Sequence, residues 1–324
     1  MSDGKLLFDT KIDTSGFKEG MSSLTGLASK VSTGIANSLK VATGALTAFG
    51  GYSVKAGMDF DAGMSEVQAI SGASGKELQA LRDKAKEMGA TTKFSASQSA
   101  EAMKYMGMAG WKSQEMIQGL PGIMNLAAAS GESLGTVSDI VTDSLSAFGM
   151  TAKDTSRYVD VLAAASTNSN TNVSMLGESF KYVAPVAGAL GYSAEDTAIA
   201  LGLMANSGIK ASMAGTTLRS AFTRLAKPTD NMIALMDEIG ISMLDSHGNM
   251  KSLGELMDNL RESMGGLSER SQTMIAQQLF GKQAMAGMLA IINASDEEYQ
   301  KLTQAIYNSS GAAEEMARVM NDNL

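Results

Sequence analysis

Helix start and stop signals recur every one or two dozen residues through most of this chain. From about residue 58 onward, Ser or Thr is repeatedly followed three residues later by an acid or amide. The pairs are Ser74–Glu77, Ser95–Gln98, Ser252–Glu255 and Ser295–Glu298, with acidic variants at Thr151–Asp154 and Ser193–Asp196. This spacing is the capping box, in which the hydroxyl caps a backbone N–H and the acid or amide reaches back. The pattern predicts many short helices and no long continuous one.

Glycines supply the matching stops, because a chain often leaves a helix through a left-handed residue and glycine adopts that conformation freely. The predicted stops are Gly89, Gly110, Gly149, Gly191 and Gly208. The chain has 34 Gly but only three Pro, and its 25 Met and many Ala favour helix. We therefore predict an all-α fold of short helices and helical hairpins for a core domain of residues 58–324.

One segment repeats within the chain. Residues 94–112 (FSASQSAEAMKYMGMAGWK) align with residues 192–210 (YSAEDTAIALGLMANSGIK), and a looser third copy begins at Met150. Each of the two closer copies opens with an aromatic residue, Ser and Ala, and closes with Gly and Lys. Capped helices that repeat in this way predict stacked helical hairpins, each burying one face on the next.

Two regions depart from this pattern. Residues 1–57 are expected to form a separate N-terminal region, with a strand or extended lead-in at 5–12 and a long helix rich in small residues at 22–50. Apolar residues recur along that helix near the 3.6-residue period, so its apolar face needs a partner, which is the core domain, a second copy or a wall. Residues 241–253 predict a small β-hairpin around Gly248.

Composition excludes several functions. The chain has no Cys, which excludes disulfides, thiolate chemistry and the usual soft ligands of zinc. Its net charge is −8, and its basic residues are scattered, which argues against nucleic acid as the main partner. No secretory signal is visible at the start, and the uncharged stretch of residues 41–54 is too short to span a bilayer.

The residues that could carry chemistry do not form a convincing site. His247 is the only histidine, and its place in a predicted turn beside Asp245 is poor for a catalytic base. Residues 71–77 resemble a phosphate loop but lack its first Gly and its Ser or Thr. The Asp59-Phe60-Asp61 run lacks the spacing of a calcium loop. We predict no catalytic, cofactor or metal residues, and we expect the methionines to fill the core more than to form a contact surface.

Six blocks in order resemble the core region of phage tail tape measure proteins over residues 58–315. They include AGMDFDAGMSEVQAI, FSASQSAEAMKYMGMAGW, LPGIMNLAAASGESLGTVSDIVTDSLSAFGM, the long stretch with SNTNV, VAPVAGALG and GIKAS, EIGISMLDSHGNMKSL, and LFGKQAMAGMLAIIN. The positions within these blocks that we expect to be structural are Phe94, Ala96, Gly110, Trp111, Asn125, Phe148, Asn168, Pro185, Gly208, Phe280 and Gly281.

The resemblance implies a structural protein, not an enzyme, that occupies the tail tube lumen and is assembled in the host bacterial cytoplasm. It implies that the protein sets tube length, nucleates tail assembly and leaves at infection. The implied partners are the tail tube protein, baseplate or tail tip proteins, tail assembly chaperones and further copies of itself, with host membrane possible at ejection. The chain ends in a helical pattern, so we expect a coiled-coil or ruler region beyond residue 324.

Four other functions remain open from the sequence, and one of them is an enzyme such as a cell-wall hydrolase. The same domain fits a tail-like bacteriocin or contractile injection system. Residues 22–57 could insert in a membrane and make the protein a channel-forming ejection protein. A cellular scaffold of helical repeats would show the same punctuation.

Overall fold

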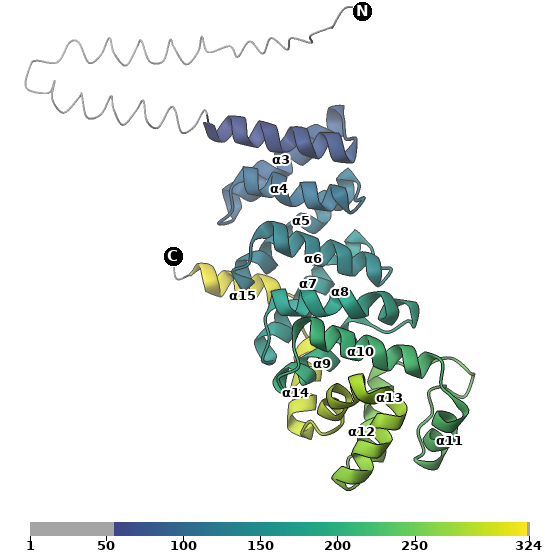
Figure 1. Ribbon diagram of the computed structural model, residues 1–324. Helices are drawn as coiled ribbons and strands as arrows, with labels where there is room; N and C mark the ends of the chain where they lie inside the picture. Colours follow the sequence, from purple (N-terminus) through teal and green to yellow (C-terminus); the bar gives the residue numbers. More distant parts are fainter. Residues whose placement is uncertain (1–54, 323–324) are drawn as a thin grey trace, which may run out of the picture. The chain divides into compact units, whose positions relative to one another are not determined.

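The computed structural model describes residues 55–322, which are mostly helical, and the all-α prediction is confirmed (Figure 1). The chain divides into two compact units, Met1–Asp59 and Phe60–Leu324, and the architecture below is that of residues 60–322. The predicted strand at 5–12 and helix at 22–50 lie outside the described residues.

Residues 55–71 are helical. The elements that follow are α3 (Gly75–Thr91), α4 (Ala96–Met108), α5 (Ser113–Ser130), α6 (Leu134–Ala147), η1 (Ala152–Asp154), α7 (Thr155–Asn168), α8 (Val173–Ala189), α9 (Ala194–Asn206), α10 (Ala211–Ala226), α11 (Asp230–Glu238), α12 (Leu253–Met264), α13 (Glu269–Ile292), α14 (Asp296–Tyr307) and α15 (Ala312–Asn321).

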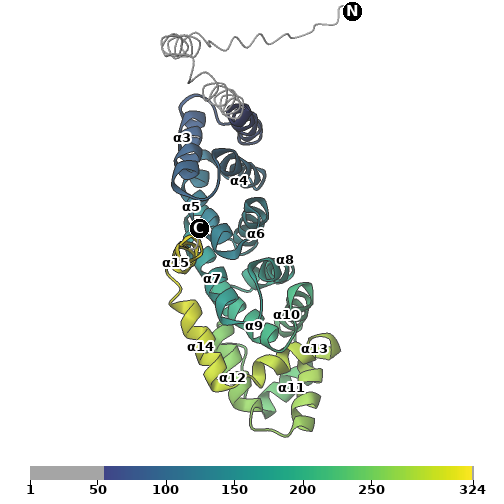
Figure 2. The ribbon, with the colours of Figure 1, turned by 90° about the vertical axis from the view of Figure 1, so that its left-hand side faces the viewer.

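Successive helices of the larger unit alternate between two layers. One layer contains α3, α5, α7 and α9, and each of these helices packs on the next. The other contains α4, α6, α8, α10 and α13 in the same relationship. Figure 2 shows the layers as two adjacent columns. This arrangement follows from the short amphipathic helices, because each one buries its apolar stripe only by contacting neighbours on both sides.

The last two helices add a third layer. After α13 the chain reverses, so that α14 packs on α9 and α7, and α15 packs on α7 and α5. Both views show these C-terminal helices, drawn in yellow, lying alongside helices from the first half of the chain (Figures 1 and 2). The helix α9 is consequently covered on nearly every side, and twelve of its thirteen residues are buried. A helix with no solvent-facing stripe belongs in the interior of a fold.

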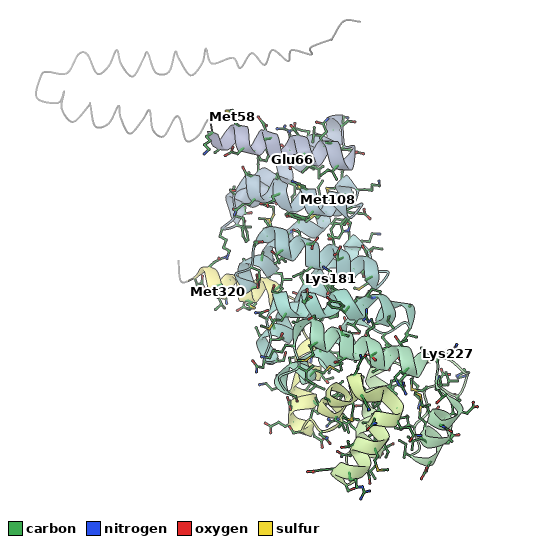
Figure 3. All side chains as sticks on the ribbon, viewed as in Figure 1. Met58, Glu66, Met108, Lys181, Lys227 and Met320 are labelled. Carbon is green, nitrogen blue, oxygen red and sulfur yellow. The ribbon has the colours of Figure 1, made fainter. Side chains whose placement is uncertain are left out.

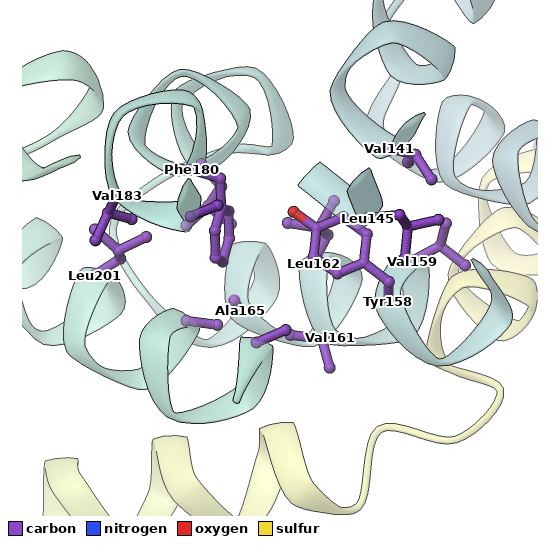
Figure 4. Close-up of a cluster of buried hydrophobic side chains, with 14 of the residues drawn as sticks. Val141, Leu145, Tyr158, Val159, Val161, Leu162, Ala165, Phe180, Val183 and Leu201 are labelled. Atoms are coloured by element: carbon purple, nitrogen blue, oxygen red, sulfur yellow. The ribbon is translucent and has the colours of Figure 1, made fainter. Parts of the chain in front are cut away.

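The core is continuous across these layers. Figure 4 shows one cluster, built from α6, α7, α8 and α9, in which Val141, Leu145, Tyr158, Leu162, Phe180 and Leu201 meet. The Phe180 ring lies edge-on to Phe148 and to Tyr158, each with ring centroids 5.7 Å apart. Most methionines that the structure describes are also buried, including Met103, Met106 and Met204. Exposed ones such as Met108 on α4 and Met320 on α15 are scattered (Figure 3).

The predicted helix starts mark real helix N-termini, but not all of them form capping boxes. Complete boxes are present at Ser95 and Ser252, and Thr151 forms one on the 3₁₀ helix η1. Ser74 is the N-cap of α3, as predicted, but its side chain makes no capping hydrogen bond. The capping box predicted there is therefore absent.

Two further boxes are half formed. The hydroxyls of Ser193 and Ser295 accept from the backbone N–H groups of Asp196 and Glu298. The two acids, however, do not reach back to the cap residues. They accept hydrogen bonds from Tyr307 and Asn206, which lie on other helices.

Four of the five predicted glycine stops have positive φ at the end of a helix: Gly110 (86°), Gly149 (69°), Gly191 (75°) and Gly208 (86°). The fifth prediction is wrong, because Gly89 lies inside α3. A Cβ at Gly89 would lie 2.5 Å from the Ala96 backbone nitrogen, so glycine is needed there for close packing of α3 against the start of α4.

The two closer copies of the internal repeat have the same local structure. The helices α4 and α9 both have 13 residues and a Ser N-cap, and both end at a glycine with φ of 86°. The next backbone N–H, of Trp111 or Ile209, donates to the carbonyl of Met106 or Met204 in the two copies. The copies nevertheless occupy different layers, so the repeat preserves a helix–turn–helix geometry and not a position in the stack.

The predicted hairpin at 241–253 is reduced to one antiparallel bridge between Leu244 and Met250. The turn between them is held by Asp245, whose carboxylate accepts from the backbone N–H groups of His247 at 2.8 Å and Asn249 at 2.9 Å. The chain is too short on either side of this turn to form a ladder.

Candidate functional site

The residues that the sequence offered as a catalytic base or as metal ligands form no shared site in the described part of the chain. His247 is exposed in its turn, and its Nδ1 lies 4.0 Å from Asp245. Backbone hydrogen bonds from Asn249 and His247 lower the pKa of Asp245, which therefore stabilises the turn. Within residues 55–322, His, Asp and Glu side chains form no group of three or more that could hold a metal ion. No helix in this part of the chain is long and apolar enough to cross a membrane.

The first motif positions lie around the α4–α5 corner. Phe94 is buried just before the Ser95 cap, and Ala96 is the first residue of α4. After Gly110, the buried Trp111 ring packs so closely on Gly119 of α5 that a Cβ there would overlap it. Trp111 therefore locks the turn onto the next helix. Asn125 lies within α5 and is half-buried.

The middle motif positions lie on α6 to α10. Phe148 is the C-cap of α6 and contacts Phe180, while Asn168 ends α7 and donates to the Ala164 carbonyl at 2.9 Å. Pro185 lies inside α8 on an exposed position. Gly208 forms the left-handed turn before α10.

The last two motif positions form a break inside α13. Phe280 is buried, and Gly281 has φ 77° and ψ 171°, a conformation essentially restricted to glycine. Arg224 of α10 donates to the carbonyls of Gln278 and Leu279, each at 3.0 Å, and so satisfies the end of the first half of α13. The LFGKQA block is thus a helix break that is capped from α10.

Glycines in the middle of helices allow close crossings along the α6–α8–α10–α13 layer. A Cβ on Gly177 would lie 2.5 Å from Ile140, and one on Gly188 would lie 2.5 Å from the Ala147 carbonyl oxygen. A Cβ on Gly215 would overlap the Ser179 carbonyl oxygen, so α8 and α10 touch backbone to backbone. The motif blocks therefore encode how helices cross and turn.

The third layer is attached by polar contacts that sequence reasoning missed. The Asp196 carboxylate accepts from the Tyr307 hydroxyl at 2.6 Å, and Asn206 donates to Glu298 at 2.6 Å. Burial and the bond to Asp196 raise the pKa of Tyr307 to about 12. Within the first layer, Arg157 of α7 binds the buried Glu195 of α9 through two hydrogen bonds of 2.5 and 2.8 Å. Buried acids inside apolar helices, such as Asp160 in VDVLAAA, are the signal that could have revealed these contacts.

A polar cavity of about 650 Å³ lies where α12, the end of α13 and the start of α14 meet. Its main side chain is Arg261, which donates to the carbonyls of Ile291 and Ala294 and pairs with Asp296 at 2.7 Å. The guanidinium carbon also lies 4.6 Å from the centroid of the Tyr299 ring. Burial, followed by a hydrogen bond to Asp258, raises the pKa of Tyr299. Because Arg261 of α12 binds groups at the end of α13 and the start of α14, we interpret it as a residue that holds these three helices together.

Two other hollows lie on the surface. One, of about 170 Å³ between α6 and α8, is lined by Asp139, Asp143, Glu178 and Lys181. Burial and then repulsion by Asp139 raise the pKa of Asp143 there. The other is an apolar groove of about 380 Å³ between the end of α10, α11 and the turn that follows. None of these hollows contains a catalytic arrangement of side chains.

Together these features define an all-helical protein in which most of the motif residues form turns, helix ends or close packing contacts. The family model of phage-related minor tail proteins matches residues 82–281, and the chain belongs to this family. It is 41% identical over 303 residues to the tape measure protein of Pneumococcus phage Dp-1, covering 94% of this chain and 26% of that protein. It is 28% identical over 273 residues to the probable tape measure protein of Escherichia phage P2, covering 83% and 34%.

These relatives confirm the resemblance to tape measure proteins drawn from the motif blocks. The chain spans about a quarter of the length of the Dp-1 protein and about a third of the P2 protein. No solved structure matches the chain.

Proposed function

We propose that this chain is part of a phage tail tape measure protein that sets the length of the tail tube, nucleates tail assembly and leaves the tube at infection. The observation that carries this proposal is the 41% identity to a tape measure protein over 94% of the chain. The proposed role is structural and not enzymatic, and the proposed location is the lumen of the tail tube after assembly in the host cytoplasm.

Residues 60–322 are suited to anchoring or delivery and not to measuring length. A ruler needs a long continuous helix, and helices rise 1.5 Å per residue. The longest described element, α13, has 24 residues and is broken at Gly281, while the uninterrupted α5 has 18 residues and spans roughly 27 Å. The length-setting part therefore belongs to sequence outside this helix stack.

The proposed partners are the tail tube protein, baseplate or tail tip proteins, tail assembly chaperones and further copies of the chain. The net charge of −8 supports protein partners over a nucleic acid as the main contact. Light scattering on residues 1–324, with and without residues 1–57, tests self-association. An oligomer that becomes a monomer on deletion supports assembly through the N-terminal region, and a monomer in both forms contradicts it.

In-frame deletions in the phage that encodes this chain test the function. We expect deletions outside residues 60–322 to shorten the tails seen by electron microscopy in proportion to the residues removed. We expect deletion of α8 to α10 to abolish tails instead of shortening them, because it removes the middle of both layers. Tails of unchanged length in the first series contradict a length-setting role.

Absence of enzymatic activity needs a separate test, since some tail proteins of this kind carry cell-wall hydrolases. The purified chain is incubated in a gel containing peptidoglycan, with lysozyme as the positive control. We expect no clearing around the chain. A cleared zone would contradict the structural role.

A further inference from the structure

The apolar groove at the end of the second layer combines three walls. The end of α10 contributes Leu225 and Pro228, α11 contributes Ile233 and Met236, and the turn that follows contributes Leu244 and Met250. Ile233 is 43% exposed and Leu244 is 47% exposed, although both are large apolar side chains. Exposed apolar side chains that share one concave surface usually mark a binding site. The groove, at about 380 Å³, is within the size range of ligand pockets, which is roughly 300–1,000 Å³.

The two walls of the groove are held by different contacts. The turn that presents Leu244 is braced by Asp245 and by the Ser242 hydroxyl, which donates to the Leu244 carbonyl at 2.7 Å. The opposite wall, α11, is held by longer contacts. Gln278 donates to the Asn231 carbonyl at 3.3 Å, and the Met232 sulfur lies 3.7 Å from Arg224. Methionine side chains in the lining, including Met236 and Met250, can also change shape to fit an occupant.

The charge around the groove indicates the chemistry of the occupant. Asp237 is the only charged side chain in the lining, it is exposed, and no side chain within residues 55–322 forms an ion pair with it. Asp230 precedes Ile233 by three residues and Asp237 follows it by four, so all three lie on one face of α11. An apolar surface whose one charged lining residue is a carboxylate is complementary to an apolar segment that carries lysine or arginine.

We infer that this groove binds an amphipathic helix of a partner protein, with the apolar face of that helix against Ile233 and Leu244 and a basic side chain paired with Asp237. A helix fits because its side chains at positions i, i+3 and i+4 project on one face, so a single turn supplies both the apolar anchors and the neighbouring cation. The inference does not depend on a role in tail assembly, because it concerns binding by the chain itself.

The test uses the full chain and two fluorescent peptides of about four helical turns. Both have leucines on one face, and their flanking positions are lysine in one peptide and glutamate in the other. Fluorescence anisotropy measures binding. We expect the wild-type chain to prefer the lysine peptide, and Asp237→Lys to prefer the glutamate peptide. Ile233→Ser and Leu244→Ser should each weaken binding of both peptides by roughly tenfold, because each removes an apolar anchor.

Matched controls separate this groove from the rest of the acidic surface. Asp83→Lys on α3 and Met108→Ser on α4 change exposed residues elsewhere on the surface, and we expect neither to alter peptide binding. Circular dichroism confirms that each variant is folded. The inference is wrong if Asp83→Lys and Asp237→Lys have the same effect, or if Ile233→Ser leaves binding unchanged. It is also wrong if the wild-type chain self-associates and Ile233→Ser abolishes this, because the groove would then hold a second copy.

Discussion

The carboxylate of Asp160 on α7 lies 2.8 Å from the backbone nitrogen of Gly311, the residue that precedes α15. Its other oxygen accepts from the backbone N–H of Ala313 at 3.0 Å. The first turn of a helix has unsatisfied N–H groups and favours negative charge. Gly311 occupies the N-cap position and has no side chain, so a residue of another helix caps α15 in its place.

Replacing Asp160 should release α15. We expect Asp160→Ala to lower the free energy of unfolding by about 1–2 kcal/mol, since two backbone donors lose their acceptor. Hydrogen exchange of α15 amides should rise more than that of α8 or α10. The exposed Asp139→Asn on α6 is the control and should change neither quantity. Unchanged exchange in α15 would show that its apolar contacts alone hold it.

The α8–α10 crossing should not tolerate a methyl group. Gly215→Ala would place its Cβ against the Ser179 carbonyl, and because backbone cannot rotate away, the helices must separate. We expect a loss of about 1–3 kcal/mol in unfolding free energy, measured by chemical denaturation. Gly266→Ala is the matched control, because nothing lies within 4 Å of a Cβ there and its φ is ordinary. Equal stability of the two variants would refute this account of the crossing.

The repeat makes a quantitative prediction about two glycines. Gly110 and Gly208 have the same φ of 86°, and a Cβ on either would meet nothing within 4 Å. Alanine at either position therefore suffers only the backbone strain of the left-handed region. We expect Gly110→Ala and Gly208→Ala each to cost about 1–2 kcal/mol, and the two values to agree closely. A large difference in thermal unfolding would mean that the surrounding layers, and not the turn, determine the cost.

Two tyrosines should respond oppositely to removal of the hydroxyl. Tyr192 is buried, and its hydroxyl has no hydrogen-bond partner in the part of the chain that the structure describes. We expect Tyr192→Phe to raise the unfolding free energy at pH 7 by about 1 kcal/mol. Tyr307→Phe should lower it by about 1 kcal/mol, because the buried Asp196 loses a donor.

Tyr192 also affects the stability of the fold at alkaline pH. Burial raises the pKa of Tyr192 to about 12, above the usual value of about 10 for an unfolded chain. A raised pKa means that the folded state favours the neutral phenol. Its contribution is therefore complete below pH 10 and is lost as the pH rises from 10 to 12. Denaturation across this window should show a shallower loss for Tyr192→Phe than for the wild-type chain, and identical slopes would contradict it.

Local signals in the sequence predicted much of the helical structure. A capping box or a glycine stop depends on residues within four or five positions of one another, so Ser95, Ser252, Gly110 and Gly208 could be interpreted from spacing alone. The failures have equally local causes. Gly89 was predicted to end a helix, but glycine is needed there because the backbone of Ala96 lies close to it. The spacing of glycines in a sequence does not distinguish a turn from a close crossing of helices.

The arrangement of the layers was not predictable in the same way. Nothing periodic connects Asp160 with Gly311, or Asp196 with Tyr307, because those contacts join residues more than a hundred positions apart. The repeat even favoured a simpler stack than the real one, since its two copies share a local geometry but face different neighbours. The helix break at Gly281 could not be predicted from its own segment, because Arg224, which caps the helix end there, lies on α10.

The third layer also fixes an order of events during synthesis. Asp160 leaves the ribosome 151 residues before Gly311. At roughly 5–20 residues per second, the surface of α7 that α15 finally covers stays uncovered for roughly 8–30 s. Neighbouring helices of the two layers can pair as soon as they emerge, because their contacts are local. Closure by α15 is therefore the last step of folding for this part of the chain, and the nascent protein passes through a stage with its final contact surface still uncovered.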